Sequence, residues 1–75
     1  MTFRILNLTG HTQTVGTVAE TMQEIERFMN SPEGKRYSLI AEAPGKEGIR
    51  ISSPAALKEM DPETVVSAIP ALVGG

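Results

Sequence analysis

The sequence predicts an α+β fold in which one amphipathic helix packs across a mixed β-sheet. Three stretches support this prediction: residues 1–8 alternate like a strand, residues 17–30 follow the period of a helix with one apolar side, and residues 64–69 form a final strand. Because a single amphipathic helix cannot bury its apolar side alone, it has to lie against one face of the sheet.

An N-terminal β-hairpin is predicted at the start of the chain. In its first strand, residues 1–8, large apolar side chains occupy alternate positions, as in a strand with one buried face: Met1, Phe3 and Ile5. Leu6 and Leu8 fall on the opposite face, which is therefore not cleanly polar. Gly10 is free to take a positive φ in a hairpin turn with a bulge, and residues 12–15 resume as the second strand.

The helix over residues 17–30 has both a start and a stop signal. Thr17 and Glu20 fit a capping box, in which each side chain accepts a hydrogen bond from the other residue's backbone N–H. Apolar side chains recur at helical spacing along one side: Val18, Met22, Ile25, Phe28 and Met29. Pro32 ends the helix because it disfavours a helical residue before it.

Two more strands and a helical turn follow. Residues 35–43 contain the third strand and residues 49–51 form the fourth, with a turn rich in glycine and charged residues between them. Ser53 is expected to cap one helical turn, with Pro54 in its first turn, where proline is tolerated. The final strand then runs into the C-terminus.

The predicted order of elements is ββαββ(short α)β, with the main helix on one side of a mixed sheet. The crossover helix leaves room for the last strand to pair beside the first, which is the arrangement of a β-grasp. The same pattern also permits other α+β sandwiches. Residues 1–70 make up the predicted β-grasp domain, and residues 71–75 a flexible C-terminal tail.

Composition excludes several classes of function. The 75 residues make one domain, and the absence of cysteine excludes disulfides, thiolate metal sites and a catalytic thiol. His11 is the single histidine, so no metal site is predicted. The net charge of −2 argues against nucleic-acid and membrane partners. With neither a transmembrane-length apolar run nor a signal-peptide pattern, the chain is expected to be cytoplasmic. It is also expected to be a monomer when free.

The sequence lacks the pattern of an active site. Ser52 and Ser53 have no histidine close to them in sequence, and His11 is better explained as a solvated turn residue. Three acidic residues follow the spacing of an exposed helix surface: Glu20, Glu24 and Glu26. Residues 45–48 lack the strand-to-helix context of a phosphate-binding loop. The chain is therefore predicted not to be an enzyme.

The sequence ends on Gly74 and Gly75, directly after an apolar run. Terminal glycines can be fraying residues or a cloning remnant. Glycine also lacks a Cβ, so this backbone can extend fully through a narrow channel and leaves its carboxylate sterically bare. We therefore expect the Gly75 carboxylate to be the reactive group of the chain, acted on by another enzyme.

With these elements in place, the chain resembles the ubiquitin family, together with the sulfur-carrier proteins of molybdopterin and thiamine biosynthesis. Residues 7–14 resemble the first hairpin turn of ubiquitin at nearly the same distance from the N-terminus, and residues 57–60 follow the family's order. The inward positions of the first strand also match: Met1, Phe3 and Ile5. Residues 69–75 are closer to the sulfur carriers, which often have a proline shortly before the glycines.

One departure from ubiquitin and one correspondence bear on the resemblance. The ubiquitin tail carries arginines where this chain has Ala71 and Val73, so the eukaryotic ubiquitin-activating enzyme is not the expected partner. The partner-binding surface of ubiquitin maps onto Leu8 and Ile69.

The resemblance implies a mechanism carried by the C-terminus. An adenylating enzyme of the ubiquitin-activating type would bind the folded body, draw the tail through a channel and let the Gly75 carboxylate attack ATP. Magnesium and ATP would belong to that enzyme, so no cofactor is expected on this chain. A side chain at Gly74 or Gly75 would clash in the channel, Pro70 would stiffen the entry to the tail, and Leu72 would anchor it in an apolar pocket. Ala71 and Val73 are also expected to take part in recognition of the tail.

Three functions remain open on these residues. The first is a protein modifier, whose activated glycine passes to a thiol and then to a lysine, with a conjugating enzyme and a deconjugating peptidase as partners. The second is a sulfur carrier, whose C-terminal thiocarboxylate supplies a sulfur-transfer synthase in molybdopterin, thiamine or tRNA thiolation. The third is a non-catalytic interaction or assembly domain with an idle tail.

Overall fold

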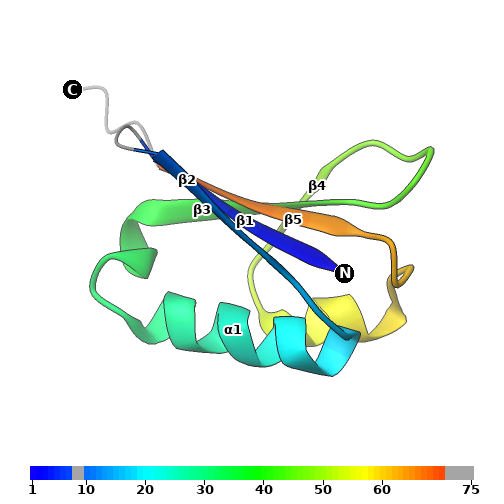
Figure 1. The fold of residues 1–75 in the computed structure, drawn as a ribbon, viewed down its shortest axis with the longest axis horizontal. Coiled ribbons are helices and arrows are strands. Elements are labelled where there is room, and N and C mark those ends of the chain that lie inside the picture. The colour runs from blue at the N-terminus through cyan, green and yellow to red at the C-terminus, as the bar shows by residue number, and fades with distance from the viewer. Residues whose placement is uncertain (8–9, 71–75) are drawn as a thin grey trace.

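The computed structural model describes residues 1–7 and 10–70. Its strands are β1 (Thr2–Asn7), β2 (Gly10–Val15), β3 (Tyr37–Glu42), β4 (Ile49–Ile51) and β5 (Val65–Pro70). Its helices are α1 (Val18–Asn30) and the 3₁₀ helices η1 (Gly34–Arg36) and η2 (Pro54–Glu59) (Figure 1). The predicted α+β class and element order are confirmed, with η1 as an addition before β3.

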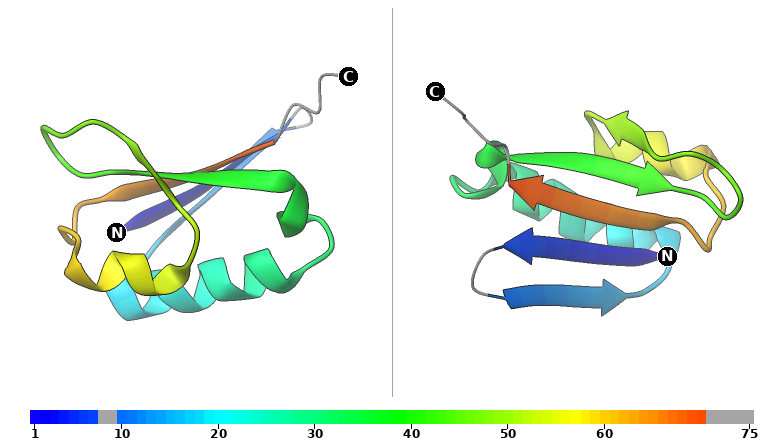
Figure 2. Two further views of the ribbon diagram at one scale, coloured as in Figure 1. Left: turned by 180° about the vertical axis from the view of Figure 1, so that it is seen from behind. Right: turned by 90° about the horizontal axis from the view of Figure 1, so that it is seen from above.

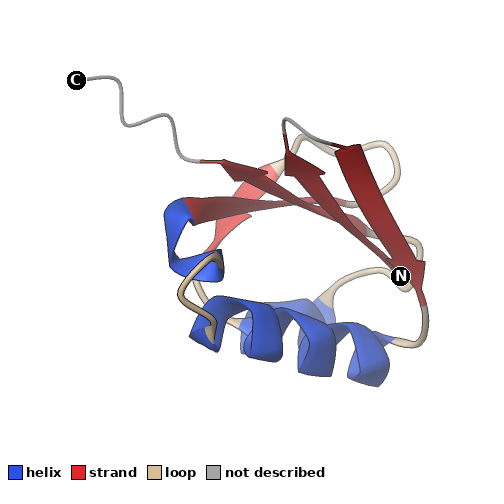
Figure 3. Ribbon diagram, turned by 60° about the vertical axis from the view of Figure 1, so that its left-hand side comes forward, coloured by secondary structure: helices blue, strands red, loops and turns tan. Residues whose placement is uncertain are grey.

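The five strands form one mixed sheet in the order β2-β1-β5-β3-β4. Strand β5 lies in the centre, parallel to β1 and antiparallel to β3, and β2 and β4 form the two edges (Figure 2). The helices lie on one side of the sheet, with α1 running across it (Figure 3). The predicted mixed sheet with one main helix is therefore present.

The core lies between the sheet and the helix layer. Ile25 of α1 and Leu57 of η2 are fully buried there. Inward-facing side chains of the strands complete this core: Phe3, Leu39, Ala41, Ile51, Val66 and Ala68. The ring of Phe28 packs edge-on against Phe3 and Tyr37, with centroid distances of 5.7 and 5.1 Å. These contacts hold α1 against β1 and β3.

Helix α1 begins with the predicted capping box. The Thr17 hydroxyl accepts a hydrogen bond from the Glu20 backbone N–H at 3.1 Å, and Glu20 Oε1 accepts one from the Thr17 N–H at 2.9 Å. Hydrogen bonds to the Glu20 carboxylate, first from the Thr17 backbone N–H and then from the Thr17 side chain, lower the pKa of this carboxyl below its usual value, because they favour the charged form. The sequence signal for this helix start is confirmed in full.

A compact turn ends α1. The Ser31 hydroxyl donates a hydrogen bond to the Phe28 carbonyl at 2.6 Å and accepts one from the Gly34 N–H at 2.9 Å. Gly34 is buried so close to the helix that a Cβ at this position would lie 1.7 Å from the Phe28 carbonyl oxygen. Only glycine fits this turn without moving the backbone.

Several predicted details are wrong. Strand β2 starts at Gly10, and the hairpin pairs residues one for one from Thr2↔Val15 to Asn7↔Gly10, so its described part has no bulge. Gly10 does take a positive φ, 147°. Ser53 makes no capping hydrogen bond, although Pro54 begins η2 as predicted. Strand β5 includes Pro70, one residue beyond the predicted end, because β3 continues to pair with it there.

Candidate functional site

The candidate site is the end of β5, where the chain leaves the sheet. Ile69 pairs with Ser38 and Pro70 with Tyr37, both on β3. The other tail residues named from the sequence lie outside the described residues: Ala71, Leu72, Val73, Gly74 and Gly75. The structure thus places the start of the tail at the centre of the sheet.

The last described residue is held by strand pairing and by the aromatic part of the core. Pro70 is half-buried and pairs with Tyr37, whose ring packs against Phe28. Strand β5 is also paired on its other side, with β1, from Val65 to Ala68. Strand β5 is therefore paired on both sides from Val65 to Ala68, and with β3 alone at Ile69 and Pro70.

Ile69 lies on the open face of the sheet, the face opposite the helices. Its neighbours along β5, Ala68 and Pro70, point to the helix side, and 41% of Ile69 is exposed. The β1–β5 register places Leu6 level with Ile69 on the same face. Leu8, the other residue predicted for a partner surface, lies outside the described residues.

A row of residues, one from each of four strands, crosses the centre of this open face. Arg4 on β1 donates a hydrogen bond from Nη2 to Ser67 Oγ on β5 at 3.0 Å. The row continues through the apolar Ile40 on β3 to Arg50 on β4. Ser67 is buried under this contact. Sequence reasoning did not identify this row, although the alternation of residues 1–5 already placed Arg4 on the face opposite Phe3.

The structure separates the other candidate residues. His11 is exposed on β2, whereas Ser52 and Ser53 follow β4, so they lie at opposite edges of the sheet. His11 therefore belongs to a strand and not to the predicted turn. Glu20 takes part in the capping box. Glu24 forms an ion pair with Arg27, in which Oε1 lies 3.9 Å from Nη1. Within residues 1–7 and 10–70, acidic and histidine side chains form no group of three that could hold a metal ion.

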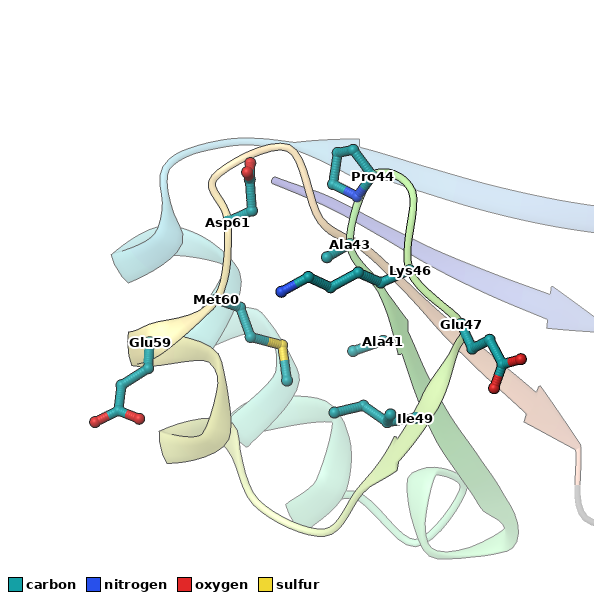
Figure 4. A pocket seen from close by; sticks show the side chains of 9 residues that line it. All are labelled: Ala41, Ala43, Pro44, Lys46, Glu47, Ile49, Glu59, Met60 and Asp61. Carbon is teal, nitrogen blue, oxygen red and sulfur yellow. The ribbon is translucent and has the colours of Figure 1, made fainter.

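A surface cavity of about 220 Å³ lies between the β3–β4 connection and the end of η2 (Figure 4). Ile49, Ala41 and Met60 give it an apolar side, and Lys46 extends across it towards the Met60–Asp61 segment. Glu47 and Glu59 lie at its rim. The cavity is next to the end of β3 that is farther from Pro70, so it is separate from the start of the tail.

Among the described residues, none of the helices has the length and apolar character needed to cross a membrane. Comparison with models of protein families, with curated proteins and with solved structures finds no match for this chain. Its function therefore has to be inferred from its own residues and geometry.

Proposed function

We propose that the chain is a ubiquitin-like β-grasp protein whose C-terminal carboxylate is adenylated by an activating enzyme and transferred to a protein target. The observation that carries this proposal is the placement of β5. This strand is central in the sheet, paired on both sides, and ends at Pro70, five residues before Gly75. A rigid body of this kind can be gripped by an enzyme while the short segment after it reaches a separate active site.

The length of the tail suits this role. Five extended residues span at most about 17 Å. An enzyme that binds the sheet end near Pro70 therefore reaches the Gly75 carboxylate only if its nucleotide site lies within that distance. The glycines at the end let the backbone enter a narrow channel, and the apolar Leu72 and Val73 supply contacts along it.

The chemistry makes a poor electrophile reactive. A Gly75 carboxylate oxygen attacks the α-phosphorus of ATP, the bond from that phosphorus to the bridging oxygen breaks, and pyrophosphate leaves. The resulting acyl-adenylate is attacked by a thiol of the enzyme, which releases AMP. A lysine amine of the target then displaces the thiol and forms an amide. All catalytic groups for these steps belong to the partner enzymes, and this chain is their substrate.

A variant pair tests the proposal in an extract of the native cells. Labelled wild-type chain incubated with ATP should form covalent adducts of higher mass, and Gly75→Ala should lose most of them while keeping its circular dichroism spectrum. Ser52→Ala, an exposed change at the opposite edge of the sheet from β2, serves as the control and should conjugate like wild type. Adducts of equal yield from Gly75→Ala would contradict the proposal.

A sulfur carrier is the second candidate, and Pro70 favours it. The proline lies four residues before Gly74, as the tail pattern of the sulfur carriers suggests, and its pairing with Tyr37 makes it the last residue of β5. In this case hydrosulfide delivered by the sulfur-transfer partner attacks the acyl-adenylate, and AMP leaves. The terminal carboxylate then becomes a thiocarboxylate, which the intact mass of the chain reveals as one sulfur in place of one oxygen. An interaction domain with an idle tail would show neither product.

A further inference from the structure

Strand β2 forms one edge of the sheet and has no described element beyond it (Figure 2). All six of its residues are exposed, on both faces of the strand, and 70% of Val15 is accessible to solvent. The helix layer therefore does not cover this strand. An edge strand of this kind presents backbone groups that another strand can pair with.

The hydrogen-bond pattern shows which residues of β2 present those groups. Met1 and Gly16 exchange both of their backbone hydrogen bonds, at 2.9 and 3.0 Å. Because bonded and non-bonded pairs alternate along an antiparallel ladder, Thr12 and Thr14 direct their N–H and C=O groups towards β1. The three residues between and beside them direct theirs outwards: His11, Gln13 and Val15.

The two edges of the sheet are protected differently. Strand β4 is three residues long and carries Arg50 at its centre, so it offers a short and charged edge. Strand β2 is six residues long and has no proline, lysine, arginine or acidic residue. Short length, charge and proline are the features by which proteins keep edge strands from pairing. Strand β2 has none of them.

We propose that β2 pairs antiparallel with β2 of a second copy, forming a continuous sheet across a twofold axis at Gln13. In this register Gln13 of one copy faces Gln13 of the other, and each His11 faces a Val15. In this register each of the three outward-facing residues of one strand exchanges backbone hydrogen bonds with a residue of the other strand. If one strand slides by two residues along the other, one of the three residues in each strand loses its partner.

The side chains suit this self-pairing. On the helix side of the sheet each Thr12 faces a Thr14 of the other copy, a pair that favours strands through its β-branched side chains. On the open face the side-chain amides of the two Gln13 residues can form hydrogen bonds with each other. Val15 of each copy packs against the ring of His11 of the other copy and is thereby shielded from water. No charged residue of β2 meets a like charge, since the strand contains none of the four charged residue types.

The contact is small, so the dimer is expected to be weak. One pair of short strands buries much less than the roughly 1,200 Å² of a standard interface. We expect a dissociation constant on the order of 0.1–1 mM. The predicted monomer is therefore the dominant species in dilute solution, and the dimer forms where the protein is concentrated or held on a common surface.

A charge-swap experiment tests the register. Gln13→Lys and Gln13→Glu each place like charges opposite each other on the axis, so each variant alone should sediment as a monomer at about 1 mM, where wild type shows dimer. Mixing the two variants should restore a dimer, because lysine then faces glutamate. Ser52→Lys adds the same charge beyond the β4 edge and should leave dimerisation unchanged.

Amide hydrogen exchange supplies a second readout that does not depend on the variants. At about 1 mM the amides of His11, Gln13 and Val15 should exchange several-fold more slowly than at about 10 µM. Those of Thr12 and Thr14, already bonded to β1, should not change. A wild-type chain that stays monomeric at about 1 mM, or a mixture of the two variants that does not associate, overturns the proposal. Either result leaves the β2 edge to an extended segment of a different protein.

Discussion

At the scale of single residues, the turn after α1 depends on Gly34. A Cβ at this position would lie 1.7 Å from the backbone oxygen of Phe28 and 2.6 Å from its carbon. Because backbone atoms cannot turn aside as a side chain does, Gly34→Ala should lower the free energy of unfolding by about 3 kcal/mol or more. Urea denaturation followed by circular dichroism measures this change.

Gly16→Ala is the matched control. Its added Cβ would meet only Glu20 side-chain atoms, at 3.1 Å or more, and a side chain can adjust. We expect a change of about 1 kcal/mol or less. Equal losses in the two variants would mean that the close approach at Gly34 does not decide the structure of this turn.

The Glu20 carboxylate makes the stability of the fold depend on pH in the acid range. Its pKa is lowered in the folded chain by the hydrogen bonds from Thr17, the backbone bond being the larger cause. A lowered folded pKa means that the stabilisation is fully present above the unfolded pKa and is lost as the pH falls through the folded one. Glu20→Gln should therefore flatten the fall in stability below about pH 4.5. An unchanged acid profile would contradict this role of Glu20.

At the scale of elements, the packing of α1 and η2 against the sheet depends on a few buried side chains. Ile25 is fully buried, so Ile25→Ala should lower the free energy of unfolding by about 2–5 kcal/mol. The free energy of unfolding of a domain of this size is roughly 4–11 kcal/mol. The variant should therefore be partly unfolded at 37 °C. Gln23→Ala, an exposed change on the same helix, should change the stability by less than about 0.5 kcal/mol. Similar thermal transitions for the two variants would contradict this packing.

The elements also differ in how well the sequence predicts them. Helix α1 was predictable because its capping box, apolar spacing and stop signal all lie within residues 17–32, the helix and its immediate neighbours in sequence. The extension of β5 to Pro70 depends on its pairing with Tyr37, which is distant in sequence and which local patterns do not contain. Thr21 is buried in α1 because it lies three residues after Val18 and four before Ile25, on the same side of the helix, but its polar side chain gave no sign of this.

At the scale of the whole molecule, the sheet links the folded body to the tail. The sequence predicted the order of the elements along the chain and the pairing of the last strand beside the first, and the resemblance to ubiquitin assigned Ile69 to a partner surface. It could not show that Arg4 bonds to Ser67 across two strands, nor that Leu6 lies level with Ile69. Those neighbours follow from the parallel pairing of β1 with β5, which joins the two ends of the chain. The open face and the start of the tail are therefore products of one contact between distant segments.

The buried Met1 limits how the protein can be handled in experiments. The Met1 amino group donates a hydrogen bond to the Gly16 carbonyl, and the Met1 side chain is buried. An N-terminal tag would disturb this corner of the fold, and a C-terminal tag would block Gly75. The untagged chain, recovered with an antibody against the body, is therefore the suitable material for a test of the terminus.

The most direct test is the chemical state of Gly75 in the chain recovered from its native cells. No lysine or arginine follows Lys58, so trypsin leaves residues 59–75 as one peptide whose terminus mass spectrometry can read. For a protein modifier, we predict that a fraction of this peptide is joined through Gly75 to a lysine of another protein. For a sulfur carrier, we predict that a fraction of it ends in a thiocarboxylate. A peptide found only with a free Gly75 carboxylate, or only continuing beyond Gly75, would contradict both predictions.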